Sequence, residues 1–315
     1  MLDKVYVQIP IFYSAGIDLE SIQLDFLNSK FIKIVDLKDY TQQFDSGHST
    51  TEDSINHHSE RFDIDFLYAL VPIDITTKNT PNIFNDINCI FLLLYPSDFT
   101  ICSIIEYDVY DDGKRSVFLG EMTWGGIQNG SHRKILLDYK TCDKQLIEDF
   151  IKLFFASKNN FPNYLDLCIR NYINHYFIWH DNLSFISLCI SMETIVEGKE
   201  QLSYRIRRNF ALLNGSTVEE CRLIEKNVQK IYELRSKLVH GETSKTYEEL
   251  QPNFNYLRSL ISFAIIELIN TGSIDRITLN QKINELGYGD KYKLCSTYDP
   301  KYQNRFNRIK SIVIH

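Results

Sequence analysis

Three residues near the end of one amphipathic stretch have the types and the spacing of a catalytic cluster. They are Arg235, Ser236 and His240, in the run Ile-Tyr-Glu-Leu-Arg-Ser-Lys-Leu-Val-His-Gly of residues 231–241. Apolar residues at helical spacing place Arg235 on the buried stripe of a helix: Cys221, Ile224, Val228, Ile231 and Leu238. A guanidinium keeps its charge and is costly to desolvate without an anion. Arg235 therefore predicts an internal salt bridge or a bound phosphate.

His240 lies in the last turn of the same predicted helix, just before Gly241, a residue type that commonly ends helices. Ser236 precedes His240 by four residues, so the two side chains are neighbours on one face and the hydroxyl can orient the imidazole. The long Arg235 side chain can reach round the helix toward the same point. A cation, an imidazole and a hydroxyl held together suit acid-base chemistry on a phosphate-bearing substrate.

The charge of the chain is uneven. A net charge of −7 makes the whole chain a poor non-specific binder of polyanions. The segment from Gln201 to Lys245 nevertheless holds nine lysines and arginines against five acidic residues. A phosphate-bearing substrate requires such a cationic segment, and solvated helix faces with paired charges explain it equally well. Its candidates for substrate contact are Arg205, Arg207, Arg208 and Lys237.

Glu193 is the acidic residue that stands out. It interrupts a predicted helix over 183–196 that is apolar nearly all round and should therefore be central to a bundle. A carboxylate in that position needs a cation, which Arg235 or one of the three arginines at 205, 207 and 208 would supply. The pair is either structural or part of the catalytic site.

The chain changes its hydrophobic period near residue 140, which predicts an α+β protein with a mostly antiparallel β domain over 1–140 and an all-α helical bundle over 141–315. Asp112-Gly113 between two of the apolar runs indicates a hairpin. The predicted strands cover 5–12, 31–35, 62–70, 90–95, 101–109, 116–122 and 134–139. The predicted helices cover 143–156, 162–179, 183–196, 203–213, 218–240 and 248–270.

Two polar segments can be interpreted either as functional sites or as ordinary solvent-exposed parts of the chain. Residues 41–60 read as a long solvated loop; they include His48, His57 and His58, whose spacing matches no established metal-ligand pattern. After Gly289 the tail mixes cations and rings, as in proteins that bind single-stranded nucleic acid. A terminal element with a charged outer face has the same composition.

Three runs of the helical half together resemble a known family. They are residues 185–193, 202–213 and 231–241, and the resemblance covers about residues 160–270. This part of the chain looks like the Apea-like branch of the HEPN superfamily. The resemblance implies a helical bundle that pairs with a second copy and cleaves RNA without a metal or other cofactor, through an Arg-x4-x6-His motif. It makes Arg235 and His240 the catalytic pair, with Ser236 as the polar residue after the arginine and Glu193 as a supporting acid.

The same resemblance implies a biological setting. Many relatives are bacterial toxins or antiviral effectors of the abortive-infection kind, which implies an activator derived from a phage or a neutralising antitoxin as partner. The β domain would then be a sensor or regulator. Seven cysteines without a Cys-x-x-Cys pair, together with no signal peptide and no long apolar run, favour a cytoplasmic protein with no membrane role.

A second pair also fits the motif. Arg170 and His175 are five apart, and Asn171 is the residue type that the family usually has after the arginine. Arg170 lies on an earlier predicted helix, ahead of Glu193, whereas the family's motif closes a later helix and is followed by glycine. We therefore prefer Arg235 and His240.

The predicted function is a metal-independent endoribonuclease in which the 2′-hydroxyl of RNA attacks the neighbouring phosphate. Two alternatives stay open. A non-catalytic module would use the same cluster to bind a nucleotide, RNA or an anion of a protein partner. A metal-dependent hydrolase would need a cluster of Asp, Glu and His with ligand spacing, for which the sequence offers no clear candidate.

Overall fold

The computed structural model describes residues 4–14, 17–42, 44, 53, 55–58, 60, 62–75, 83–94, 99–110, 116–123, 144–178, 180–196, 200–243, 245, 247–294 and 309–314. The chain divides into two compact units. One comprises residues 1–130 with 142–148, and the other comprises residues 131–141 with 149–315.

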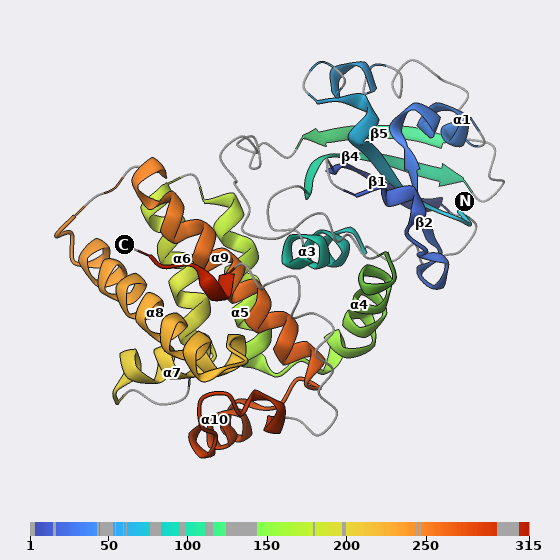
Figure 1. Ribbon diagram of the computed structural model, residues 1–315. Coiled ribbons are helices and arrows are strands. Elements are labelled where there is room, and N and C mark those ends of the chain that lie inside the picture. Colours follow the sequence, from blue (N-terminus) through green and yellow to red (C-terminus); the bar gives the residue numbers. More distant parts are fainter. Residues whose placement is uncertain are drawn as a thin grey trace. The chain divides into compact units, whose positions relative to one another are not determined.

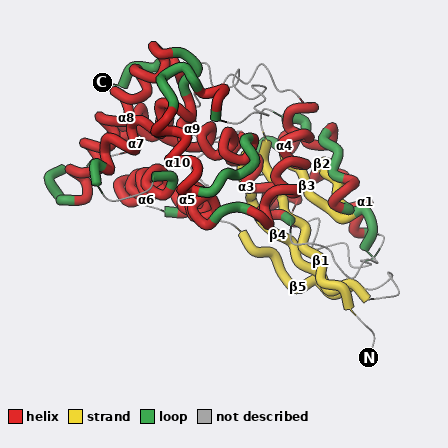
Figure 2. Tube along the Cα trace, turned by 90° about the horizontal axis from the view of Figure 1, so that it is seen from below, coloured by secondary structure: helices red, strands yellow, loops and turns green. Residues whose placement is uncertain are grey.

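The first unit is built on a five-stranded antiparallel sheet with the strand order β2-β3-β1-β4-β5 (Figures 1 and 2). The strands are β1 (Lys4–Ser14), β2 (Ser29–Lys33), β3 (Leu67–Pro72), β4 (Phe99–Tyr110) and β5 (Ser116–Thr123). Both long strands, β1 and β4, lie at the centre and are rich in β-branched and aromatic residues, which pack well on a pleated surface.

Alternating residues of the central strands face one hydrophobic core. Val5, Val7, Ile9 and Ile11 of β1 belong to it, together with Ile105, Tyr107 and Val109 of β4. The short helix α1 (Leu37–Thr41) and its flanks close this core with Ile34, Leu37, Tyr40 and Phe44. The prediction of an antiparallel β domain in the first part of the chain is confirmed.

The predicted strand over 90–95 is wrong. Residues 90–94 belong to α3 (Phe84–Leu94), which packs against β4 and lies on the other face of the sheet, where Phe91 meets Phe31. Residues 89–94 of this helix are all buried, so the sequence there reads as one continuous apolar run without a helical period. A fully buried helix and a fully buried strand cannot be told apart by such a run.

The second unit is helical, and the α+β class is therefore confirmed (Figure 1). Helix α4 (Lys144–Ser157) begins in the first unit and continues into the second. The other helices of the second unit are α5 (Asn163–Asn174), α6 (Asp181–Thr194), α7 (Leu202–Asn214), α8 (Val218–Val239), α9 (Tyr247–Asn270) and α10 (Arg276–Glu285). Helices α4 to α9 match the six predicted helices to within a few residues, except that α5 ends before His175. The sequence did not predict α10, which Asp275 caps by accepting a bond from the Thr278 N–H.

Helix α6 is central to the bundle, as its nearly uniform apolar character predicted. It contacts α5, α7, α8 and α9. Helix α8 begins with a capping box, in which the Thr217 hydroxyl and the Glu220 carboxylate each accept a backbone N–H at the helix start. Its predicted apolar stripe is buried, which sets the rotation of α8 and hence the direction of the residues near its end.

Some predictions concern residues outside the described part of the chain: the strand over 134–139, the Asp112-Gly113 turn and residues 45–52 of the polar segment over 41–60. Among the helices that the structure describes, none combines the length and the apolar character needed to cross a bilayer.

Candidate functional site

The end of α8 holds His240 at the surface in a defined backbone conformation. Gly241 adopts a φ of +71°, and its N–H bonds the Leu238 carbonyl at 3.3 Å. The N–H of Glu242 bonds the Lys237 carbonyl at 2.9 Å, which completes a Schellman motif. The predicted helix end at Gly241 is confirmed. His240 is exposed and directly precedes this turn, so its imidazole can meet a ligand from solvent.

Arg235 pairs with Glu193 across the contact between α8 and α6. Arg235 Nη2 lies 3.0 Å from Glu193 Oε1, and the two side chains are 24% and 22% exposed. The sequence predicted this pairing as one of several choices for Glu193, and the structure selects it. Arg235 Nε is buried and has no hydrogen-bond partner among the described residues. The guanidinium is therefore held in place by the carboxylate while one of its donors is unused.

Two further residues shape this pair. The Arg235 guanidinium lies 5.7 Å from the centre of the Tyr232 ring, one turn earlier on α8. Burial raises the pKa of Tyr232, and the Glu193 carboxylate adds to the effect. Burial also raises the pKa of Cys189, one turn before Glu193, well above its usual range, so this thiol stays protonated and is not a nucleophile.

The other polar residues of the predicted cluster sit on the outer side of α8. Ser236 is half-buried and Lys237 is exposed. Ser236 and His240 are four residues apart on one face of α8. In the part of the chain that the structure describes, no side-chain hydrogen bond joins them. The structure thus brings Arg235 and Glu193 together and leaves His240 open at the helix end.

The three arginines of α7 have separate surroundings. Arg207 donates to Gln229 Oε1 of α8 at 2.7 Å and to the Ser203 carbonyl at 3.3 Å. Arg208 donates to the carbonyls of Ile283 and Leu286 at 3.2 and 2.6 Å and so caps the C-terminal end of α10. Arg205 is half-buried. Arg208 therefore has a structural role, because it binds the end of α10 to α7.

The rival pair, Arg170 and His175, is split between two environments. The Arg170 side chain is 71% exposed and pairs with Asp166 at 2.9 Å, an i,i+4 contact on the surface of α5. His175 is buried, its Nδ1 bonds the Tyr172 carbonyl, and its Nε2 accepts a bond from Arg258 Nε at 3.0 Å. A guanidinium in solvent and an imidazole in the core do not form one site.

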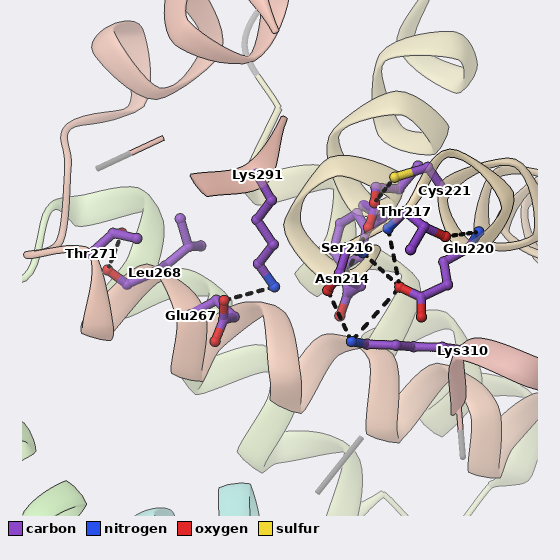
Figure 3. Close-up of polar contacts among 12 residues, drawn as sticks. Asn214, Ser216, Thr217, Glu220, Cys221, Glu267, Leu268, Thr271, Lys291 and Lys310 are labelled. Atoms are coloured by element: carbon purple, nitrogen blue, oxygen red, sulfur yellow. Dashed lines mark hydrogen bonds and ion pairs between the residues drawn. The ribbon is translucent and has the colours of Figure 1, made fainter. Parts of the chain in front are cut away.

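Two lysines of the basic tail point into the bundle (Figure 3). Lys291 Nζ lies 2.7 Å from Glu267 Oε2, and both side chains are 1% exposed. Lys310 Nζ donates to Ser216 Oγ at 3.0 Å and lies 3.8 Å from Glu220 Oε2. Burial lowers the pKa of Lys291 to about 8, while the Glu267 carboxylate opposes this shift. These two cations hold the C-terminal part of the chain to the bundle and are withdrawn from any nucleic acid.

The interpretation of residues 41–60 as a solvated loop is wrong for its described part. Residues 53 and 55–58 are helical, and His58 is buried with its Nε2 at 2.7 Å from Ser103 Oγ and 2.8 Å from Glu121 Oε1. The polar composition hid this because the partners of His58 lie on β4 and β5, far along the chain. His48 lies outside the described residues.

Among the described residues, no group of three or more histidines, cysteines and acids is arranged to hold a metal ion. The described cysteines, which are Cys89, Cys102, Cys168, Cys189 and Cys221, are all free and buried.

Two buried ionic residues of α9 were not predicted from the sequence. Arg258 and Glu267 each stand alone among apolar residues of this helix. The signal that singled out Arg235, a charge on an apolar stripe, is present at both positions and would have found them.

Comparison with known proteins gives no match for this chain: no family model, no curated protein and no solved structure is similar to it.

Proposed function

We propose that this protein is a metal-independent endoribonuclease of the HEPN type, with Arg235 and His240 at the end of α8 as its catalytic pair. The observation that carries the proposal is the arrangement of Arg235. Its guanidinium is fixed by Glu193 at the edge of the bundle, and its buried Nε has no partner among the described residues. The Arg235 side chain is 24% exposed, so a phosphate oxygen can approach its guanidinium from solvent, and the exposed His240 imidazole follows on the same helix.

The reaction needs three contributions. A base takes the proton of the 2′-hydroxyl, whose oxygen then forms a bond to phosphorus. The bond from phosphorus to the 5′-oxygen breaks, and an acid protonates that leaving oxygen. The products are a 2′,3′-cyclic phosphate and a 5′-hydroxyl. The His240 imidazole serves as the base or the acid, and the Arg235 guanidinium stabilises the charge that grows on the phosphate oxygens.

A single chain offers one His240, so the proposed active form is a homodimer that brings two His240 and two Arg235 side chains to one two-fold axis. Exposed apolar residues beside the Arg235–Glu193 pair support such a contact. Ile190 lies one turn before Glu193 on α6, and Val239 lies one turn after Arg235 on α8. Exposed apolar side chains clustered on one surface favour association.

Light scattering should therefore report about twice the 37.0 kDa mass of one chain for the active protein. Ile190→Lys should shift the protein toward the monomer and lower RNA cleavage in parallel, since a charge in the contact is costly to desolvate. Ile277→Lys is the matched control, because Ile277 is also an exposed isoleucine but lies on α10. A fully active monomer at every dilution would refute the composite site.

The first unit would act as a sensor or regulator of the ribonuclease, in the manner of a toxin or antiviral defence effector in the bacterial cytoplasm. A phage-derived activator or an antitoxin would be its partner. An unrestrained ribonuclease injures its host, which is the reason for expecting such control.

A non-catalytic module is the second candidate. The observation that favours it is the same ion pair: Glu193 already neutralises much of the Arg235 charge, so the pair can serve as a structural contact between α6 and α8. In that case the α8 end would bind a nucleotide or a partner without cleaving RNA.

An RNA cleavage assay in the presence of a chelator separates these functions. The proposed ribonuclease should cleave RNA at an unchanged rate after metal ions are removed and should leave 2′,3′-cyclic phosphate ends. No cleavage of any RNA by the dimer would favour the binding module. Cleavage that returns only on addition of a divalent metal would instead identify a metal-dependent hydrolase.

A further inference from the structure

Arg258 is a buried cation that faces no anion among the described residues. It lies in the middle of α9 and is 5% exposed. No carboxylate among the described residues lies within ion-pairing distance of it, whereas the two other buried cations of this unit, Lys291 and Lys310, both face a carboxylate. A charge withdrawn from water in this way is costly unless an anion or several hydrogen bonds compensate it.

The contacts of Arg258 hold its guanidinium in place without neutralising it. The carbon Cζ lies 5.3 Å from the ring centre of Tyr176 and 5.3 Å from that of Phe254. Such cation–π contacts lower the cost of burial but leave the charge and the hydrogen-bond donors. Arg258 Nε donates to His175 Nε2 at 3.0 Å.

His175 is fixed as a neutral acceptor. Its Nδ1 bonds the Tyr172 carbonyl, which only accepts, so Nδ1 carries the proton. Its Nε2 faces an Arg258 N–H that only donates, so Nε2 carries none. The imidazole therefore adds no charge, and the positive charge of Arg258 is left as the net charge of this group.

Four of the five guanidinium N–H groups, those on Nη1 and Nη2, have no acceptor among the described residues. Neither nitrogen is among the sealed side-chain atoms that lack a partner, so both keep some exposure to solvent although Arg258 as a whole is only 5% exposed. The planar fork of a guanidinium matches phosphoryl and carboxylate oxygens in paired hydrogen bonds. A phosphoryl group presents three terminal oxygens to these four donors and a carboxylate only two.

We propose that Arg258 is the centre of a binding site for a small or terminal phosphoryl group, such as inorganic phosphate or the end phosphate of an oligonucleotide. Tyr176, Phe254 and His175 hold the guanidinium, and its Nη1 and Nη2 bind the oxyanion. Because Arg258 is only 5% exposed, a terminal phosphate can approach it more easily than an internal phosphodiester, which carries chain on both sides. The site does not depend on RNA cleavage and is distinct from Arg235 and His240.

Equilibrium dialysis with radiolabelled inorganic phosphate tests the site on the full-length protein, at constant ionic strength with chloride as the background salt. Wild type should bind about one phosphate per chain in a saturable manner. Arg258→Lys keeps the charge but lacks the fork, so its affinity should fall about tenfold or more. Arg170→Met is the matched control, because it removes an arginine that is 71% exposed and should leave binding unchanged.

Competition identifies the source of the phosphoryl group. A short RNA with a 5′-phosphate should displace the labelled phosphate, whereas the same RNA with a 5′-hydroxyl, or acetate at equal concentration, should not. Equal displacement by acetate would refute selection for a phosphoryl group. No saturable binding by wild type, or unchanged binding by Arg258→Lys, would refute the site itself.

A readout on wild type alone covers the case in which the variants fail to fold. Phenylglyoxal modifies arginines, and mass spectrometry of peptides follows each one. Phosphate should slow modification of Arg258 and leave the rate at Arg170 unchanged. Equal rates at Arg258 with and without phosphate would overturn the proposal.

Discussion

Arg235→Ala and His240→Ala are each expected to lower the rate of RNA cleavage by about two orders of magnitude or more. The first removes the cation that stabilises charge on the phosphate, and the second removes the imidazole that transfers protons. Ser236→Ala should have a smaller effect, because a hydroxyl that orients the imidazole does not itself take part in bond making. The measurement is the initial cleavage rate of wild type and each variant on one RNA.

Folding must be separated from catalysis in this comparison. Arg235→Ala leaves Glu193 partly buried without its cation, so part of its effect could come through stability. Circular dichroism and the unfolding midpoint of each variant therefore accompany the rates. His240 is exposed at the helix end, so His240→Ala should unfold at nearly the wild-type temperature and is the cleaner test.

The rival motif has its own control. Arg170 is exposed and contacts Asp166 on the surface, so Arg170→Ala should preserve both the fold and the cleavage rate. A large loss of activity in this variant, with His240→Ala fully active, would mean that the wrong pair was chosen. His175→Ala is less informative, because it would leave the buried Arg258 Nε without its acceptor.

The helical half was the more predictable part of the fold. Helices such as α8 combine a capping residue, a periodic apolar stripe and a final glycine within one segment, so their limits follow from local sequence. The exception was α3, whose burial on all sides removed the period on which the prediction depends. The strands of the sheet were found from alternation, but their order was not, because it depends on pairing between distant segments.

The candidate site divides in the same way. Arg235 and Glu193 could be matched from sequence because a charge on each of two apolar stripes demands a partner. The burial of His58 and of Lys291 could not be predicted from the sequence. Both look like solvated residues until the fold brings Ser103 to His58 and Glu267 to Lys291. Local charge thus predicts which residues need a partner, and only the tertiary structure says which partner they find.

Lys291→Met is expected to lower the free energy of unfolding by about 3–5 kcal/mol, the cost of leaving one member of a buried ion pair alone. The reason is that Glu267 would keep its position in α9 without a cation, and both side chains are only 1% exposed. Lys293→Met is the matched control two residues away. Lys293 also forms an ion pair, with Asp290 at 3.0 Å, but it is 68% exposed, so its loss should leave the free energy of unfolding almost unchanged.

The double variant Lys291→Met/Glu267→Met should recover most of the lost stability, because removing both charges also removes their desolvation cost. Urea unfolding of wild type, Lys291→Met, Glu267→Met and the double variant gives the coupling energy between the two residues.

The pH dependence of the free energy of unfolding provides a second test. Burial lowers the pKa of Lys291 to about 8 in the folded protein, below its ordinary value, so the unfolded chain binds more protons above that pH. Lys291 should therefore make wild type more stable as the pH rises from about 8 to about 10, relative to the double variant. A Lys291→Met protein as stable as Lys293→Met, or a difference between wild type and the double variant that stays flat over this range, would show that the lysine is not buried with its carboxylate in solution.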